Sequence, residues 1–134
     1  MAKTILMVDD SPSIRELVGY TLRHAGYDVI EAVDGLEGVE RAQACRLDLV
    51  ITDIDLPMLD GLELVRTLRA CTRYASTPIL LLTTESTVEM KRRAKALGAT
   101  GWLVKPFDPK ELVRVVRQVA GHAEAVPGPG HRWG

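Results

Sequence analysis

Residues 47–64 read LDLVITDIDLPMLDGLEL, an apolar run that ends in a carboxylate and is followed by a turn and a periodic segment. The run Asp48–Thr52 is too short for a helix, and its continuous apolar character is typical of a parallel strand covered on both faces. The pair Asp60-Gly61 marks a turn, and the periodic segment after it predicts a helix. A buried strand followed by a helix is the first sign of an α/β fold.

The same pattern recurs along the chain. We predict strands at Thr4–Val8, Asp28–Ala32, Asp48–Thr52, Pro78–Thr83 and Gly101–Val104. Each strand is followed by a longer segment of helical period. Five strand–helix repeats predict an α/β domain, (βα)5, with a doubly wound five-stranded parallel sheet, helices on both faces and right-handed crossovers.

Capping residues mark the predicted starts and ends of the helices. In a capping box, a short polar side chain precedes a Glu by three residues, and both satisfy backbone N–H groups of the first turn. The pairs are Asp34/Glu37, Asp60/Glu63, Ser86/Glu89 and Asp108/Glu111. Ser11-Pro12 opens the first helix, and Gly26 and Gly98 end the first and fourth helices. The predicted core-facing stripe of the first helix is Ile14, Leu17, Val18, Thr21, Leu22 and Ala25.

Length and composition indicate one domain with an apolar core. The chain has 134 residues, of which 46% are hydrophobic and 4% aromatic. We expect a domain over residues 1–121 and a tail over residues 122–134, which contains Pro127-Gly-Pro-Gly. Cys45 and Cys71 show no metal-ligand spacing, and together with the absence of a signal peptide they predict reduced thiols in a cytoplasmic protein.

The charges are unevenly distributed. The formal net charge is −1, but residues 1–70 carry a net charge of −6 and residues 71–134 carry +5. Overall neutrality argues against a dedicated nucleic-acid binder, and no apolar stretch is long enough to span a membrane. We therefore expect a monomer that neither binds nucleic acid nor inserts into a membrane, with an acidic site in the first half and a basic face in the second.

Charged and hydroxyl side chains follow four of the five predicted strands. In open parallel sheets, ligands bind beyond the carboxyl ends of the strands. The residues found there are Asp9, Asp10, Asp53, Thr83 and Lys105. Any one of them could be an ordinary turn residue, but five at strand ends are harder to explain by turn chemistry.

The chemistry of this set indicates a metal and a phosphoryl group. Neighbouring carboxylates repel each other by roughly 4 kcal/mol per pair at an effective dielectric near 20, so a cation or shared protons must offset the repulsion. Mg²⁺ prefers carboxylate, water and phosphate oxygens. An Asp carboxylate can also attack phosphorus to form an acyl phosphate, and the Lys105 ammonium would stabilise the charge that develops.

Four motifs resemble those of bacterial response-regulator receiver domains. They are VDDS (8–11), DIDLPMLDG (53–61), LLTTE (81–85) and WLVKPF (102–107). The likeness is strongest to single-domain, CheY-like receivers and covers about residues 3–120. It implies a strand order of 2-1-3-4-5, which is known for CheY itself.

The resemblance implies roles for the site residues. Asp53 would accept a phosphoryl group from the phosphohistidine of a sensor kinase. Asp9, Asp10 and Asp53 would hold Mg²⁺ together with the backbone carbonyl of Asp55. Thr83 and Lys105 would contact the phosphoryl oxygens, and the Lys105-Pro106 peptide bond would be cis.

The resemblance also implies a switch and a tuning pair. Thr83 and an aromatic residue on the fifth strand, here Trp102, would move together on activation. A Trp packed permanently against the fourth helix is an equally good interpretation. Asp55 and Glu85 occupy the two positions that tune phosphoryl lifetime in this family, and we hypothesise that both affect it.

A basic face occupies the last third of the chain. By resemblance, Lys91, Arg92, Lys95, Trp102 and Arg114 lie on the surface of the fourth helix, fifth strand and fifth helix, through which receivers signal; Arg93, Lys110 and Arg117 add to its charge. A charged helix is usually no more than a solvated face. A functional face of this charge predicts an acidic protein partner, such as a flagellar motor switch, a phosphorelay histidine protein or another regulator.

The predicted function is a phosphorylation-activated signalling switch that binds a partner in chemotaxis, with a phosphorelay intermediate as the alternative. Its catalysis is limited to its own phosphotransfer and dephosphorylation. A rival from another class is an aspartyl-phosphate phosphatase, because Asp53-Ile54-Asp55 resembles the DxD motif of haloacid-dehalogenase-type enzymes. Leu56-Pro57 and the lack of room for a cap domain argue against it. A receiver that binds partners without phosphorylation is a third alternative, which the complete set of site residues disfavours.

Overall fold

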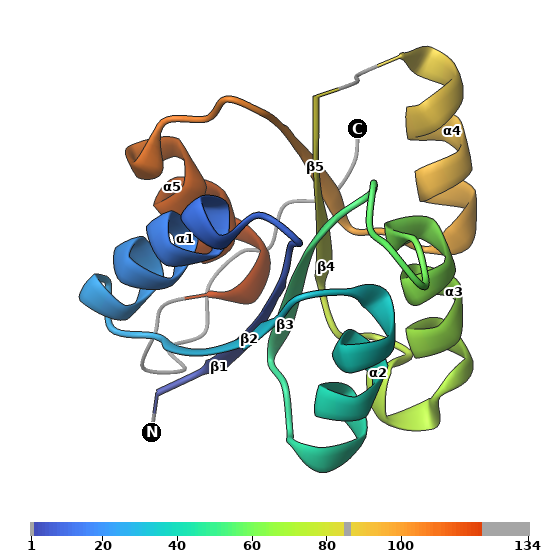
Figure 1. Cartoon of the computed structure of the whole chain (residues 1–134), viewed down its shortest axis with the longest axis horizontal. Helices are drawn as coiled ribbons and strands as arrows, with labels where there is room; N and C mark the ends of the chain where they lie inside the picture. The colour runs from blue at the N-terminus through green and yellow to red at the C-terminus, as the bar shows by residue number, and fades with distance from the viewer. Residues whose placement is uncertain (1, 85–86, 122–134) are drawn as a thin grey trace.

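The structure, a computed structural model, describes residues 2–84 and 87–121 (Figure 1). Its elements alternate along the chain: β1 (Thr4–Val8), α1 (Pro12–His24), β2 (Asp28–Ala32), α2 (Gly35–Ala44), β3 (Leu49–Asp53), α3 (Gly61–Ala70), the short 3₁₀ helix η1 (Thr72–Tyr74), β4 (Ile79–Thr83), α4 (Val88–Leu97), β5 (Gly101–Val104) and α5 (Pro109–Ala120). The predicted tail over residues 122–134 and the predicted cap Ser86 lie outside the described residues. Within the described part of the chain, no helix has both the length and the apolar character needed to cross a membrane.

The five strands form one parallel sheet in the order β2-β1-β3-β4-β5, which confirms the predicted fold. Strand β3 begins one residue later than predicted and includes Asp53, which pairs in register with Leu82 of β4. Val8 pairs with Thr52, and Thr83 pairs with Val104. The carboxyl ends of β1, β3, β4 and β5 are therefore level with one another.

Helices cover both faces of the sheet. In Figure 1, α1 and α5 lie on one face and α2, α3 and α4 on the other. The two buried clusters follow this division because successive strand residues point to opposite faces. One contains Leu6, Val50, Leu64 and Leu81, and the other contains Ile5, Leu22, Ile51 and Val116.

The predicted stripe of α1 is wrong at Leu17, whose side chain is 39% exposed. The buried residues of this helix are Val18, Gly19 and Leu22. Successive residues are rotated by about 100° around a helix, so Leu17 turns toward solvent once Val18 faces the sheet. The buried stripe is narrower than the sequence pattern indicated.

The helix caps are confirmed at four of the five predicted starts. Ser11 caps α1 and is followed by Pro12, as predicted. Asp34 and Asp60 accept hydrogen bonds from the third backbone N–H of α2 and α3, at 2.8 and 2.9 Å. Asp108 caps α5, although its side chain accepts from Lys110 N and not from Glu111 N. For α4 the prediction was wrong by one residue, because Thr87 is the cap and accepts from Met90 N at 3.2 Å. Both Ser and Thr are favoured N-cap residues, so residue type alone did not identify which of the two neighbours caps α4.

Candidate functional site

The register of β1 and β3 brings three carboxylates together. Asp9 follows the pair Val8–Thr52, and Asp53 is the next residue on the neighbouring strand. One carboxylate oxygen each from Asp9, Asp10 and Asp53 lies within 4.8 Å of the others. Asp9 is 0% exposed and Asp53 is 8% exposed, whereas Asp10 faces solvent. The sheet therefore holds two carboxylates in a largely buried position and leaves the third at the rim.

Lys105 reaches this cluster from the edge strand. Its backbone N–H donates to Thr83 O at 2.7 Å, which continues the pairing of β5 with β4. Its Nζ donates to Asp9 Oδ2 at 2.9 Å and to Asp53 Oδ2 at 3.1 Å, and its side chain is 15% exposed. The Lys105–Pro106 peptide bond is cis, as expected. One ammonium group is thus shared between two carboxylates that lie far apart in the sequence.

The electrostatics favour a further cation. Burial raises the pKa of Asp53, the Lys105 charge counteracts this, and the Asp9 charge adds to it, so the pKa lies above its ordinary value of 3.8. For Lys105, burial lowers the pKa, but hydrogen bonds and charges from Asp9 and Asp53 outweigh it and raise the pKa above 10.5. The ammonium group is therefore firmly charged, and it leaves the ionised form of Asp53 incompletely compensated.

The loop after β3 folds closely over Asp53. Asp55 N donates to Asp53 Oδ1 at 3.3 Å, and Gly61 N donates to Ile54 O at 2.8 Å. A Cβ atom on Gly61 would lie 2.1 Å from Asp53 O, a distance that no side chain can occupy. Met58 has a φ of 71°, in the left-handed region. A glycine is thus needed at position 61, where the first residue of α3 packs against the backbone of Asp53.

The structure places the remaining predicted residues as follows. Thr83 ends β4 and is 1% exposed, and its backbone is joined to Lys105. Trp102 is half-buried and packs against the cluster that contains Ala94 of α4. The basic residues Lys91, Arg92, Arg93, Lys95, Lys110, Arg114 and Arg117 are exposed on α4 and α5. Asp55 is exposed, and Glu85 lies outside the described residues.

Sequence reasoning missed Arg15. This residue of α1 donates from Nη1 to Asp9 O at 2.6 Å, and its Nε lies 3.6 Å from Glu31 Oε1 on β2. One signal was available, because a cationic residue in the first turn of a helix lies near the positive end of the helix dipole and is unfavourable there. The contact itself depends on three elements meeting in space, which no local pattern reveals.

The donor set fits a hard divalent cation. Three carboxylates offer closely spaced oxygen ligands, one of them open to solvent, and neither His nor Cys is part of the group. Mg²⁺ takes such a site with one or two carboxylates and completes its shell with waters and phosphate oxygens. The residues that could hold it are Asp9, Asp10 and Asp53, with the backbone of Asp55 nearby.

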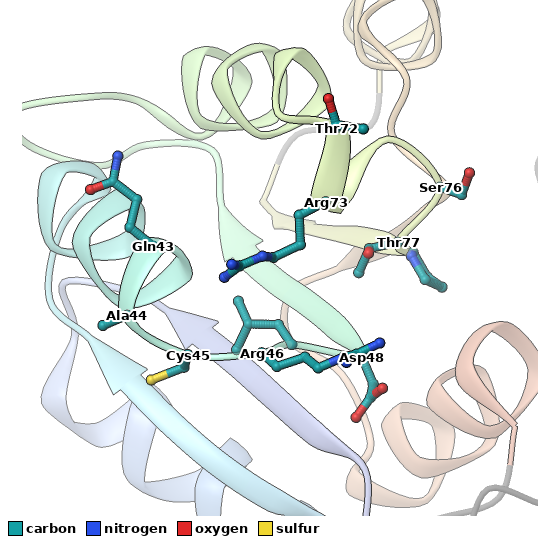
Figure 2. A pocket seen from close by; sticks show the side chains of 11 residues that line it. Gln43, Ala44, Cys45, Arg46, Asp48, Thr72, Arg73, Ser76 and Thr77 are labelled. Carbon is teal, nitrogen blue, oxygen red and sulfur yellow. The ribbon is translucent and has the colours of Figure 1, made fainter.

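A second hollow lies at the opposite end of the sheet, around the amino ends of β3 and β4. It has a volume of about 770 Å³ and is lined by residues of the α2–β3 and η1–β4 connections, including Arg46, Asp48, Arg73 and Thr77. Figure 2 shows the Arg73 side chain extending from η1 into it. None of the residues that follow the carboxyl ends of the strands lines this hollow. We therefore do not assign the phosphoryl chemistry to it, despite its volume.

Comparisons with known proteins agree with this geometry. A family model described as "Response regulator receiver domain" matches residues 5–117. The chemotaxis response regulator CheY4 of Vibrio cholerae is 47% identical in sequence, with a TM-score of 0.85, over 87% of this chain and 98% of that chain. The receiver domain of a sensor histidine kinase from Pseudomonas aeruginosa PAO1, solved with magnesium in its active-site cleft, is 32% identical with a TM-score of 0.80, over 87% of this chain and 96% of that chain.

A longer relative also matches. The dual master transcriptional regulator RpaA of Synechocystis is 38% identical over 92% of this chain and 51% of its own length. The chain spans about half the length of this and other curated transcriptional relatives. A family match over residues 5–117, a TM-score of 0.85 to a chemotaxis response regulator and an acidic cluster at the carboxyl edge of the sheet lead to one conclusion: this chain belongs to the response regulator receiver domain family of two-component signalling.

Proposed function

We propose that this protein is a phosphorylation-dependent switch in which Asp53 is the phosphoacceptor and the receiver unit spans residues 1–121. One observation carries the proposal: Lys105 Nζ lies within hydrogen-bonding distance of both Asp9 and Asp53, at the edge of the sheet where three carboxylates converge. Burial of Asp53 without full compensation of its charge is the arrangement that a nucleophilic, cation-assisted carboxylate needs.

The proposed reaction is transfer from a phosphohistidine of a sensor kinase. An oxygen of Asp53 attacks phosphorus, an O–P bond forms, and the P–N bond breaks with its electron pair returning to the imidazole nitrogen, which takes up a proton. The Lys105 ammonium stabilises the negative charge on the phosphoryl oxygens, and Thr83 serves as a hydrogen-bond donor to one of them. When bound by Asp9, Asp10 and Asp53, Mg²⁺ would neutralise the remaining charge.

The signal would leave through the surface of α4, β5 and α5. The phosphoryl group on Asp53 would carry roughly −1.5 to −2 charges in place of the single carboxylate charge. Asp53 is largely buried at the end of β3, whereas the basic residues of α4 are exposed. Signalling therefore requires a two-state rearrangement, and moving it from 1:99 to 99:1 takes roughly 5.5 kcal/mol of differential stabilisation. Thr83 and Trp102 are the proposed moving pair. The exposed cations Lys91, Arg92, Lys95 and Arg114 favour an acidic protein partner.

Chemotaxis is the role we favour, because the likeness to CheY4 of Vibrio cholerae covers 98% of that chain. The flagellar motor switch would then be the partner, and the protein would act as a cytoplasmic monomer. A second candidate role is control of a regulator or a phosphorelay, which the transcriptional and sensor-kinase relatives support. Binding of the phosphorylated chain to a motor-switch peptide, compared with binding to a phosphorelay histidine domain, distinguishes the two roles.

Labelling with a small phosphodonor tests the phosphoacceptor. The chain is incubated with acetyl phosphate and Mg²⁺, and its intact mass is measured for the wild type, Asp53→Asn and Asp60→Asn. Asp60→Asn is the matched control, because it neutralises a carboxylate of the same loop while Asn retains the helix cap. We expect one phosphoryl group on the wild type and the control, and none on Asp53→Asn. Labelling of all three would place the acceptor elsewhere, and sustained turnover of a phosphomonoester would favour the phosphatase alternative.

Asp55 and Glu85 are the proposed tuning residues. Two carboxylates close to an anionic phosphoryl group would affect the placement of the attacking water. The lifetime of the acyl phosphate is compared among the wild type, Asp55→Asn and Glu85→Ala. Equal lifetimes in all three would end the proposal of a tuning role.

A further inference from the structure

Arg15 occupies a place that helix stability does not explain. It lies in the first turn of α1, where the helix dipole disfavours a positive charge. Its side chain is nevertheless only 16% exposed. A guanidinium group held close to the protein interior at the unfavourable end of a helix must be kept there by contacts outside the helix.

Those contacts lead to the acidic site and to the neighbouring strand. Arg15 Nη1 donates to the backbone carbonyl of Asp9 at 2.6 Å, a charge-assisted hydrogen bond. Its Nε is 3.6 Å from Glu31 Oε1 on β2, and Glu31 also pairs with Arg23 at 3.1 Å. Glu31 therefore anchors the guanidinium group, which in turn holds the Asp9 carbonyl.

Asp9 is fixed at each of its polar groups. Its N–H donates to Ala32 O at 3.2 Å, its Oδ1 accepts from Ser11 N at 2.9 Å, and its Oδ2 accepts from Lys105 Nζ at 2.9 Å. Arg15 takes the remaining group, the carbonyl oxygen. This carbonyl belongs to the peptide that joins Asp9 to Asp10. Because a peptide unit is planar, holding its oxygen sets the direction in which the chain continues to Asp10.

We infer that Arg15 is a positioning residue for the cation site, which acts by fixing the Asp9–Asp10 peptide so that both carboxylates face the same point. The inference rests on the proposed function, since it assigns a residue to the site that would hold Mg²⁺. Groups that orient metal ligands typically change metal affinity by roughly 10–100-fold when they are removed.

The opposing effect of charge makes this inference sharply testable. Arg15 is a cation close to a cluster of carboxylates, and removing a cation by itself strengthens the attraction of Mg²⁺. A bystander Arg15 therefore predicts unchanged or tighter Mg²⁺ binding in Arg15→Gln. A positioning Arg15 predicts weaker binding, so the two interpretations differ in the sign of the change.

The test measures the Mg²⁺ dissociation constant by isothermal titration calorimetry on the full chain. Arg23→Gln is the matched control, because Arg23 also pairs with Glu31 and its replacement removes one positive charge, but Arg23 makes no hydrogen bond to Asp9. We expect the dissociation constant to rise about tenfold in Arg15→Gln and to stay near the wild-type value in Arg23→Gln. Urea unfolding without Mg²⁺ is measured in parallel, so that a general loss of stability is separated from a loss of affinity.

A conservative variant covers the case in which Arg15→Gln fails to fold. Arg15→Lys retains the positive charge and a hydrogen-bond donor group, but its single ammonium nitrogen lacks the planar fork with which Arg15 contacts both Asp9 and Glu31. We expect the Mg²⁺ dissociation constant of Arg15→Lys to lie between those of the wild type and Arg15→Gln. If Arg15→Gln is unfolded, the dissociation constant of Arg15→Lys should still exceed that of the wild type. Wild-type or tighter Mg²⁺ affinity in every variant that folds would overturn this inference and leave the proposed function standing. Absence of Mg²⁺ binding by the wild-type chain would overturn the proposed function and this inference together.

Discussion

The Lys105 ammonium lies 2.9 Å from Asp9 Oδ2 and 3.1 Å from Asp53 Oδ2, so the lysine is bound at least as closely to the proposed metal ligand Asp9 as to the proposed phosphoacceptor. Lys105 therefore compensates part of the negative charge of both carboxylates. Mg²⁺ would enter a site whose negative charge is already partly neutralised.

Replacement of Lys105 by Gln should have two opposite effects. Mg²⁺ should bind more tightly, because an adjacent positive charge is removed. Labelling of Asp53 by acetyl phosphate at saturating Mg²⁺ should slow by about tenfold or more, because a donor to the developing negative charge is lost. Calorimetry and intact mass against time measure the two effects. Lys110→Gln, which neutralises an exposed lysine of α5, is the control. An unchanged labelling rate in Lys105→Gln would remove this lysine from the proposed chemistry.

Asp53→Asn should stabilise the protein at neutral pH without Mg²⁺. Burial and the Asp9 charge raise the pKa of Asp53 in the folded state, so the folded state holds the proton more tightly than the unfolded state does. The associated stability is complete below the unfolded pKa and is lost as the pH rises through the folded pKa. We expect Asp53→Asn to be more stable at pH 7 by roughly 1 kcal/mol, the size of a close charge repulsion in a well-screened setting.

Urea unfolding at pH 7 and at pH 4 measures this effect. The stability difference between Asp53→Asn and the wild type should shrink at the lower pH, where the wild-type carboxyl becomes protonated. Addition of Mg²⁺ should reverse the order at pH 7, because a cation that binds only the folded state stabilises it. A wild type that is the more stable protein at pH 7 without Mg²⁺ would contradict the prediction.

Gly61→Ala should disrupt the junction between β3 and α3. The new Cβ would meet the Asp53 carbonyl oxygen at 2.1 Å, and backbone atoms cannot yield as a flexible side chain does. We expect a loss of about 3 kcal/mol in the free energy of unfolding, at the upper end for overpacking. Gly38→Ala is the control, since its Cβ would meet only the side chains of Leu64 and Val8 at 3.3 Å. Comparable losses of unfolding free energy in both variants would contradict the argument that close contact with the Asp53 carbonyl makes position 61 less tolerant than position 38.

Tyr27 provides a test of alkaline stability away from the acidic site. Its hydroxyl donates to Gly121 O at 2.9 Å, and burial raises its pKa above 10.0, although the charge and hydrogen bond of Arg117 act in the opposite direction. Above pH 10 the unfolded chain loses the Tyr27 proton first, so stability falls as the pH rises. Tyr27→Phe should cost about 1 kcal/mol at pH 8 through the lost hydrogen bond. The deficit should narrow at pH 10.5, measured by urea unfolding, and a constant deficit would contradict the pKa argument.

The strands and caps were predictable because their determinants are local. Continuous apolar runs predicted three strands with the observed bounds and two within one residue. Asp34 and Asp60 cap their helices through side chains that reach only three residues along the chain. The cap of α4 was misplaced because Ser86 and Thr87 are adjacent residues that both carry a capping hydroxyl group. Leu17 was misplaced because both it and its neighbour Val18 are apolar, and only Val18 is buried.

By itself, the sequence determined which residues end the strands, and the order of its motifs determined the family. Only the tertiary structure decided which of those residues touch. Lys105 contacts both Asp9 and Asp53 because the strand order β1-β3-β4-β5 and its register make four strand ends level, and Arg15 reaches the Asp9 carbonyl because α1 packs beside β2. Local periodicity reports how a segment folds, whereas contacts between residues distant in the chain depend on how the segments pack, and the acidic site consists of such contacts.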